Sequence, residues 1–388
     1  MVGSMEMVNN LEKWLDGGVI FGIGRERPGD LQAEDGLAAF RPGAAWLPSS
    51  PGQVLLAWGK KKRGQHPFEN NAPSFYFPDY FLTDPMPWVQ YECHQEISIE
   101  SLISQLASVA EAPSLTVVSR LKWQPFCKMF FEETFDELQR EIKEGRLSKA
   151  VPFIVETASA SMQRGQLVRS LTKALRYIEA HPVYLYGFWD QTEGILGVSP
   201  EILFEYDERG NLKTMACAGT RPIEDEDSHL LSDSKELHEH ELVVKGIVSS
   251  LTPYGSISIG DRKLLKLSKL MHLVTPIEAR LDRPAQFADL VRALHPTPAV
   301  GAFPKKQGTI WLEKYQQKIH RGRFGAPAGY CTANRNKGHC CVAIRNIQWT
   351  SQEIQVTAGC GIVAESQCER EWEELQLKLN TIKEMLAL

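Results

Sequence analysis

The order of the strand-like runs is the feature that most constrains the fold of this chain. Three such runs follow one another at 182–189, 194–206 and 211–219, and two more are consecutive at 339–349 and 353–359. Strands that arrive in succession, rather than alternating singly with helices, are typical of α+β proteins. The order therefore predicts a large antiparallel sheet assembly flanked by helices and argues against a doubly wound parallel sheet.

Apolar side chains at three- and four-residue spacing, together with capping residues, predict the flanking helices. They mark five segments, at 132–145, 162–179, 232–251, 284–294 and 368–387. Either Ser232 or Asp233 is expected to cap the third segment, because a short polar side chain there can accept from the first backbone N–H groups.

Residues 1–125 are less informative than the rest of the chain. They contain strand-like runs at 53–58 and 115–118 among proline-rich turns. No low-complexity linker and no repeat of solenoid length divides the sequence. We therefore expect a single domain over 1–388, in which residues 126–388 carry the motifs with chemical meaning.

The charge balance limits the partners of the protein. Lys plus Arg total 43 against 48 Asp plus Glu, which gives a net charge of −5. Such a chain lacks the positive field that attracts nucleic acid or an anionic membrane, so neither is expected as a partner. The basic run 60–63 is interpreted as a solvated loop. A small anion held by local charges remains compatible with this composition.

The location of the protein is expected to be the cytoplasm. No stretch approaches the roughly 18 apolar residues of a membrane-spanning helix, and residues 1–5 do not have the pattern of a secretory signal. The eight cysteines form no Cys-x-x-Cys pair. Their apolar, strand-like surroundings favour buried thiols in a reducing compartment over zinc ligands or disulfides.

Two acidic helix faces could together bind a divalent cation. Glu371, Glu374 and Lys378 lie at i, i+3 and i+7 and therefore share one face of the last helix. The segment 233–241 provides a second acidic face. Carboxylates from two helices suit Mg²⁺, which prefers hard oxygen ligands, whereas a solvated face with an ion pair is the simpler alternative. Zinc is disfavoured, because His238 and the next histidine do not form a His-Glu-x-x-His pattern.

Other polar residues interrupt apolar segments. Glu201 lies in such a run, where it is either a general acid with a pKa raised by burial or a glutamate at a strand edge facing water. Lys149 lies at the start of another apolar run, where it is either a general base or a lysine whose ammonium extends to solvent. The glycine-bearing turn at 358–361 could hold an anion through its N–H groups or be only a tight turn. Arg345 offers a guanidinium to a carboxylate, and His295 lies in a rigid Pro/Gly-rich segment.

Taken in order, these segments resemble the chorismate-utilising enzyme family, which includes isochorismate synthases, anthranilate synthase large subunits, aminodeoxychorismate synthases and salicylate synthases. The resemblance covers about 145–380. The matching motifs are Ser199-Pro-Glu201, Ala218-Gly-Thr-Arg-Pro222, Asp233-x-Lys-x-x-x-Glu-His240, His295-Pro-Thr-Pro-Ala-Val-Gly301, Ile344-Arg345, Ala358-Gly-Cys-Gly361, and Glu371-Trp-Glu-Glu374 with Lys378.

The resemblance implies a fold and a set of site residues. The fold would be of the anthranilate-synthase type, with two large antiparallel sheets packed together and helices outside. Glu239 and Glu374 would bind Mg²⁺, with Glu371 close by through water, and the ion would bind one carboxylate of chorismate. The implied substrate-binding residues are Gly219, Thr220, His295, Ala299, Arg345, Gly359, Cys360, Gly361 and Lys378.

The resemblance is strongest to isochorismate synthases. In those enzymes a lysine activates the water that attacks C2, and a glutamate protonates the departing C4 hydroxyl. Lys149 and Glu201 stand at these two positions. Aminodeoxychorismate synthases have a nucleophilic lysine where this chain has Ala218, and salicylate synthases usually have threonine where it has Ala299.

The predicted activity is therefore the Mg²⁺-dependent conversion of chorismate to isochorismate, a precursor in menaquinone and siderophore biosynthesis. The alternatives are a salicylate synthase, another chorismate-utilising enzyme, and a catalytically silent chorismate-binding protein. Since water is the expected nucleophile, no glutamine amidotransferase subunit is expected, and a monomer is predicted.

Overall fold

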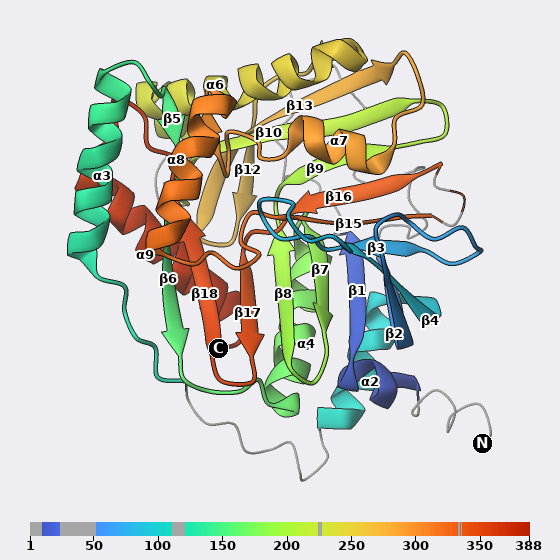
Figure 1. The fold of residues 1–388 in the computed structure, drawn as a ribbon. Coiled ribbons are helices and arrows are strands. Elements are labelled where there is room, and N and C mark those ends of the chain that lie inside the picture. Colours follow the sequence, from blue (N-terminus) through green and yellow to red (C-terminus); the bar gives the residue numbers. More distant parts are fainter. Residues whose placement is uncertain (1–9, 24–51, 111–120, 224–226, 333, 335) are drawn as a thin grey trace.

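The computed structural model describes residues 10–23, 52–110, 121–223, 227–332, 334 and 336–388 (Figure 1). Besides the helical residues 10–16, its helices include α2 (Ile99–Ala110), α3 (Lys128–Lys143), α4 (Arg164–Ala180), α5 (Asp227–Ser232), α6 (Ser234–Leu251), η2 (Thr252–Tyr254), α7 (Phe287–Leu294), α8 (Lys305–Lys318) and α9 (Cys368–Met385). Its strands are β1 (Gly18–Ile23), β2 (Gln53–Gly64), β3 (Ser74–Tyr76), β4 (Trp88–Ser98), β5 (Lys149–Ala150), β6 (Phe153–Ala158), β7 (Tyr184–Trp189), β8 (Glu193–Ser199), β9 (Ile202–Tyr206), β10 (Asn211–Pro222), β11 (Gly255–Ile259), β12 (Lys263–Leu267), β13 (Leu270–Leu281), β14 (Ala302–Phe303), β15 (Pro327–Cys331), β16 (Gly338–Val342), β17 (Asn346–Thr350) and β18 (Ile354–Gly359).

Most strands belong to one antiparallel ladder. Its order is β11-β13-β10-β9-β16-β15-β3-β4-β2-β1-β7-β8-β17-β18-β6, with β12 paired to β13, while β14 and β5 form a separate pair. Figure 1 shows two groups of strands that run in different directions, one from β11 to β3 and the other from β4 to β6. The predicted antiparallel architecture is confirmed. Its two large sheets are two halves of one hydrogen-bonded ladder.

The two halves face each other across the main hydrophobic core. Phe21 in β1 and Tyr330 in β15 stand four strands apart in the ladder, which would separate them by about 19 Å in a flat sheet. Their ring centroids are 5.2 Å apart. The ladder is therefore strongly curved, and side chains from both halves fill the space between them.

Helices cover the outside of both halves, as predicted. α4 and α9 lie against the half that contains β7, β8 and β18, and α6 and α7 lie against β10 and β9 in the other half (Figure 1). Asp233 caps α6, because its Oδ1 accepts a hydrogen bond of 3.1 Å from the N–H of Glu236. Within the described residues, no helix is both long and apolar enough to cross a membrane.

The predicted elements differ from the observed ones at informative places. The predicted strands 194–206 and 339–349 are each two strands, β8 and β9 in one case and β16 and β17 in the other. The basic run 60–63 is part of β2 rather than a loop, so that interpretation was wrong. Its side chains are solvated, because β1 pairs with β2 only up to Trp58. The runs 1–5 and 115–118 lie outside the described residues.

The two unpredicted breaks place site residues side by side. Each break is a crossing from one half of the ladder to the other, the first containing Glu201 and the second containing Arg345. The N–H of Val342 donates to the carbonyl of Glu201 at 3.1 Å, and the N–H of Val198 donates to that of Arg345 at 3.1 Å. Main-chain hydrogen bonds therefore fix the two crossings against each other.

Candidate active site

A cavity of about 610 Å³ of empty space lies where these crossings meet α6, α9 and the ends of β10 and β18. Nine of the sequence-predicted site residues line it, from segments that are far apart in the chain: Glu201, Gly219, Thr220, Glu239, Ala299, Arg345, Gly359, Gly361 and Lys378.

Glu201 is an isolated acid in the wall of this cavity. Its side chain is 1% exposed and accepts a hydrogen bond of 3.2 Å from the hydroxyl of Thr297. Burial raises the pKa of the Glu201 carboxyl to about 8, although the Thr297 hydroxyl and the Lys149 ammonium each lower it. The side chain therefore keeps its proton at neutral pH and can donate it.

A histidine that the sequence analysis did not identify connects two other cavity residues. His272 in β13 lies between Arg345, whose NH2 is 2.9 Å from Nε2, and Thr220, whose Oγ1 is 3.0 Å from Nδ1. Because a guanidinium only donates, Nε2 must accept and Nδ1 must carry the proton. Burial, followed by the charges of Arg345 and Lys378, lowers the pKa of His272 well below its ordinary value. The neutral ring leaves the Thr220 hydroxyl hydrogen free for a ligand.

Arg345 has an unusual backbone at the second crossing. Its φ of 55° is in the left-handed region, which costs about 1 kcal/mol for a residue other than glycine. This conformation accompanies a side chain that is buried against His272 and directed at the cavity. The guanidinium is therefore available to bind a carboxylate there.

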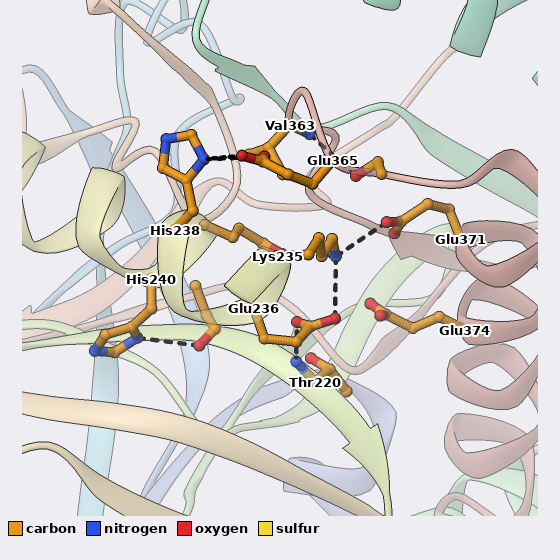
Figure 2. Close-up of polar contacts among 12 residues, drawn as sticks. Thr220, Lys235, Glu236, His238, His240, Val363, Glu365, Glu371 and Glu374 are labelled. Carbon is orange, nitrogen blue, oxygen red and sulfur yellow. Dashed lines mark hydrogen bonds and ion pairs between the residues drawn. The ribbon is translucent and has the colours of Figure 1, made fainter. Parts of the chain in front are cut away.

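Four glutamates surround the ammonium group of Lys235, and we call them the acidic cage: Glu236, Glu239, Glu371 and Glu374. The Lys235 Nζ is 3.2 Å from Glu236, 3.0 Å from Glu239 and 3.0 Å from Glu371. Figure 2 shows the ammonium between α6 and α9, with the Glu374 carboxylate pointing into the same space. The two acidic helix faces predicted from the sequence therefore meet.

The carboxyls of the acidic cage differ in their proton affinity. Burial raises the pKa of Glu236 and Glu371, and repulsion by neighbouring carboxylates adds to the effect. Burial would also raise the pKa of Glu239, but the ammonium groups of Lys149 and Lys235 outweigh it and lower this pKa. Burial opposes the charge of Lys235 as well, yet the carboxylates raise its pKa well above the ordinary value.

Lys149 lies behind the acidic cage. It is 0% exposed, and its Nζ is 3.0 Å from Oε1 of Glu239. Glu239 of this pair lines the cavity, and Lys149 is not among the lining residues. Gly361 packs against the pair, and a Cβ there would be 2.0 Å from the Glu239 carboxylate and 2.7 Å from Cε of Lys149. A side chain at this position would displace the buried pair, and its absence brings the backbone of the 358–361 turn against the pair.

Lys378 contacts the acidic cage and also lies at the cavity. Its Nζ donates to the carbonyl of Gly359 at 2.8 Å and is 2.5 Å from the Glu374 carboxylate one turn earlier in α9. It also lines the cavity. A cleft of about 800 Å³ adjoins this region and is lined by Glu371, Glu374 and Lys235 among others. The cage is therefore open toward that cleft.

Two of the sequence-predicted substrate residues lie away from the cavity wall. The His295 ring donates its Nε2–H to the carbonyl of Tyr80 at 2.6 Å and packs edge-on against the Tyr80 ring. The N–H of Cys360 donates to the carbonyl of Pro152 at 3.3 Å, and its side chain is buried in the main core. Both residues hold the backbone near the site.

Lys235, Glu236 and His272 are the residues of this region to which the sequence analysis assigned no role. The first two were part of the motif at 233–240, and the i, i+4 spacing of Lys235 and Glu239 was the signal that could have identified their pairing. His272 lies in β13, which the sequence analysis did not predict, so its sequence offered no comparable signal.

The donor atoms of the acidic cage fit a divalent cation of the Mg²⁺ type. All are carboxylate oxygens, which that ion prefers, and Oε2 of the buried Glu371 has no hydrogen-bond partner. Among the described residues, no three His, Cys, Asp or Glu side chains lie close enough together to coordinate an ion. The Lys235 ammonium holds the central position between them.

Comparison with known proteins bears on the fold and the family. The salicylate biosynthesis isochorismate synthase of Pseudomonas aeruginosa is 37% identical over 201 residues, which are 50% of this chain and 42% of that protein. The chain thus spans less than half the length of this curated relative.

Two solved structures share the fold. One is MenF, the menaquinone-specific isochorismate synthase from Escherichia coli, with a TM-score of 0.72 and 20% identity over 99% of both chains. The other is anthranilate synthase component I from Streptococcus pneumoniae, with a TM-score of 0.63 and 22% identity over 83% of this chain and 82% of that one. These likenesses confirm the predicted anthranilate-synthase-type fold.

A sequence model of the family described as chorismate binding enzyme matches residues 88–387, which is most of the chain and includes every motif of the cavity and the acidic cage. The chain belongs to the chorismate binding enzyme family.

Proposed function

We propose that this protein is a Mg²⁺-dependent isochorismate synthase, which converts chorismate to isochorismate by adding water at C2 with loss of the C4 hydroxyl. The observation that carries the proposal is the buried Glu201 carboxyl, which keeps its proton at neutral pH in a cavity whose cationic side chains, Arg345 and Lys378, suit a dicarboxylate. The family membership and the name of the Pseudomonas relative support the same reaction.

The cations of the cavity would bind and orient the substrate. Arg345 and Lys378 line the cavity and would each hold a carboxylate of chorismate, with the Thr220 hydroxyl donating beside them. Mg²⁺ bound by Glu239, Glu371 and Glu374 would neutralise one substrate carboxylate and fix its position. A dianion on a protein of net negative charge needs such local positive charge.

The reaction would use one acid and one base. Lys149, as the neutral amine, would take a proton from the water whose oxygen forms a bond to C2. The ring double bonds shift, the bond from C4 to oxygen breaks, and Glu201 gives its proton to the departing hydroxyl. For this role Lys149 must leave its ion pair with Glu239, and engagement of Glu239 by a cation favours that step.

Product identification tests this proposal. Chorismate is incubated with the protein with and without Mg²⁺, and the products are separated by chromatography. We expect isochorismate only with Mg²⁺, and little product from Lys149→Ala. Salicylate with pyruvate would instead identify a salicylate synthase, and binding without turnover would identify a silent chorismate-binding protein.

We further propose that the protein is a cytoplasmic monomer that works without a glutamine amidotransferase subunit. Its product would enter menaquinone or siderophore biosynthesis. Water as the nucleophile supports the absence of an amidotransferase subunit, because water needs no partner that supplies ammonia.

A further inference from the structure

The proposed reaction gives no role to Lys235, although this lysine is the centre of the acidic cage. Its side chain is 13% exposed, and the three carboxylates that it contacts are between 3% and 8% exposed. Two of them, on Glu236 and Glu239, belong to α6, and the third, on Glu371, belongs to α9. One ammonium group therefore links the two helices that carry the cage.

The contacts of Lys235 are those of a cation in a coordination site. Its Nζ is nearly equidistant from the three carboxylates, at 3.0 to 3.2 Å. An ammonium has three hydrogens to donate, so three contacts exhaust it. The Lys235 side chain thus supplies, from within the chain, the positive charge that converging carboxylates require.

A second observation shows that the acidic cage has more donor capacity than the ammonium uses. Oε2 of Glu371 is buried and has no hydrogen-bond partner, and Glu371 is 3% exposed. Glu374 points into the same space (Figure 2) but is paired with Lys378. Mg²⁺ accepts about six oxygen ligands, so it can use oxygens that one ammonium leaves unpaired.

An ion and the ammonium cannot hold the same central position. At a separation of about 3 Å their repulsion would exceed that of two unit charges, because the ion is divalent. Lys235 has space to move, since it lines the cleft of about 800 Å³ next to the cage. Asp233 and Glu365 line the same cleft and offer carboxylates to a displaced ammonium.

We propose that Lys235 occupies the cation position of the acidic cage in the metal-free protein, keeps α6 and α9 together there, and is displaced when Mg²⁺ binds. This inference rests on the proposed function in one respect, the assignment of Mg²⁺ to the cage. It makes Lys235 a positioning residue, which competes with the ion and does not bind it.

The test replaces the ammonium by an apolar group of similar length. We expect Lys235→Met to unfold at a lower temperature than the wild type in EDTA, because the three carboxylates that Lys235 contacts then lose the cation they share. Saturating MgCl₂ should remove most of this difference. In calorimetric titrations the variant should bind Mg²⁺ about tenfold more tightly, because no internal cation competes.

Lys383→Met is the matched control. Lys383 lies in α9, is 16% exposed and pairs with the buried Glu156, but it is outside the acidic cage. Its loss should lower the melting temperature equally in EDTA and in MgCl₂ and leave Mg²⁺ affinity unchanged. If Lys235→Met does not fold, Lys235→Met with Glu236→Gln restores the net charge of the cage and should show the same tighter binding.

The outcomes separate this inference from the proposed function. If the wild type binds Mg²⁺ and Lys235→Met binds it equally or more weakly, displacement is wrong while the magnesium assignment stands. An EDTA melting temperature unchanged by Lys235→Met would overturn the bridging role. If neither protein binds Mg²⁺ in calorimetry, the magnesium assignment itself fails, and the displacement idea fails with it.

Discussion

Glu201 and Glu239 of the acidic cage place the same type of side chain in two opposite environments. Glu201 accepts one hydrogen bond from a hydroxyl, and burial raises its pKa to about 8. Glu239 is just as buried, but two ammonium groups contact its carboxylate and lower its pKa. Burial is therefore shared by both regions, and the neighbouring charges decide which carboxyl keeps a proton.

This difference separates the two tasks that the proposed reaction requires. A carboxyl that stays protonated at neutral pH can supply a proton to a leaving group. Carboxylates that stay charged can hold cations, whether a lysine or a metal ion. The four experiments below test this division, starting with the largest expected effect.

Replacing the isolated acid should abolish most of the turnover. Glu201→Gln keeps the size and neutrality of the protonated side chain but cannot donate an acidic proton, so we expect kcat to fall roughly 10³-fold with little change in KM. Steady-state kinetics with chorismate measure both. The control is Glu205→Gln, at a buried glutamate in β9 that contacts His339 in β16, and this variant should keep its turnover. A Glu201→Gln enzyme with nearly normal kcat would refute the assignment of the acid.

Replacing Glu239, the carboxylate of the comparison that stays charged, should reduce the stability of the protein. Glu239→Gln leaves the buried ammonium groups of Lys149 and Lys235 without a shared carboxylate, which should cost about 3 kcal/mol of unfolding free energy. Urea unfolding in EDTA measures the loss. Glu241→Gln, on the exposed face of α6, serves as control and should change stability by less than about 0.5 kcal/mol. Equal losses in the two variants would contradict the charge argument.

The two carboxyls should also respond to pH with opposite signs. The pKa of Glu201 is raised on folding, so its contribution to stability is full below the ordinary glutamate pKa and is lost as the pH rises through about 8. Turnover should fall about tenfold per pH unit above that value, as the acid form disappears. The contribution of Glu239, whose pKa is lowered, is present above the ordinary pKa and is lost as the pH falls. A pH–rate profile with no alkaline limb would exclude Glu201 as the acid.

The smallest expected effect concerns the one hydrogen bond that Glu201 receives. Thr297→Val removes the hydroxyl that lowers the Glu201 pKa, so the alkaline limb of the pH–rate profile should move to higher pH. We expect kcat to fall about fivefold or less, because the proton becomes harder to release. Thr297→Ser keeps a hydroxyl and should keep the wild-type profile. A shift to lower pH would mean that the hydroxyl stabilises the protonated form.

The sequence predicted the helices and the residues of the acidic cage, because both depend on local spacing. Asp233 was one of two expected caps and is the observed cap of α6. Glu371 and Glu374 share a helix face by their spacing alone, and the opposing face on α6 carries Glu239. Helical periodicity therefore indicated which carboxylates could meet, and the family motifs indicated that they do.

The strand breaks could not be predicted in the same way. The segments around Glu201 and Arg345 are mostly apolar, so the hydrophobic pattern alone continues each strand through its crossing. Only Pro200, which cannot donate to a strand ladder, marks the first break in the sequence. The break at Arg345 depends on a positive φ, which an arginine in the sequence does not predict. His272 likewise joins Thr220 and Arg345 only because β13 pairs with β10, a long-range contact without a local signal.

The reciprocal main-chain bonds between the two crossings have a consequence for how such a site changes. The peptide groups next to Glu201 and Arg345 hold each other in place, whichever side chains these positions carry. The backbone therefore sets the distance between the proton donor, Glu201, and the residue that binds a carboxylate, Arg345. Changes elsewhere in the cavity wall can then alter which bond of a bound diacid reacts, while the frame that aligns it stays the same.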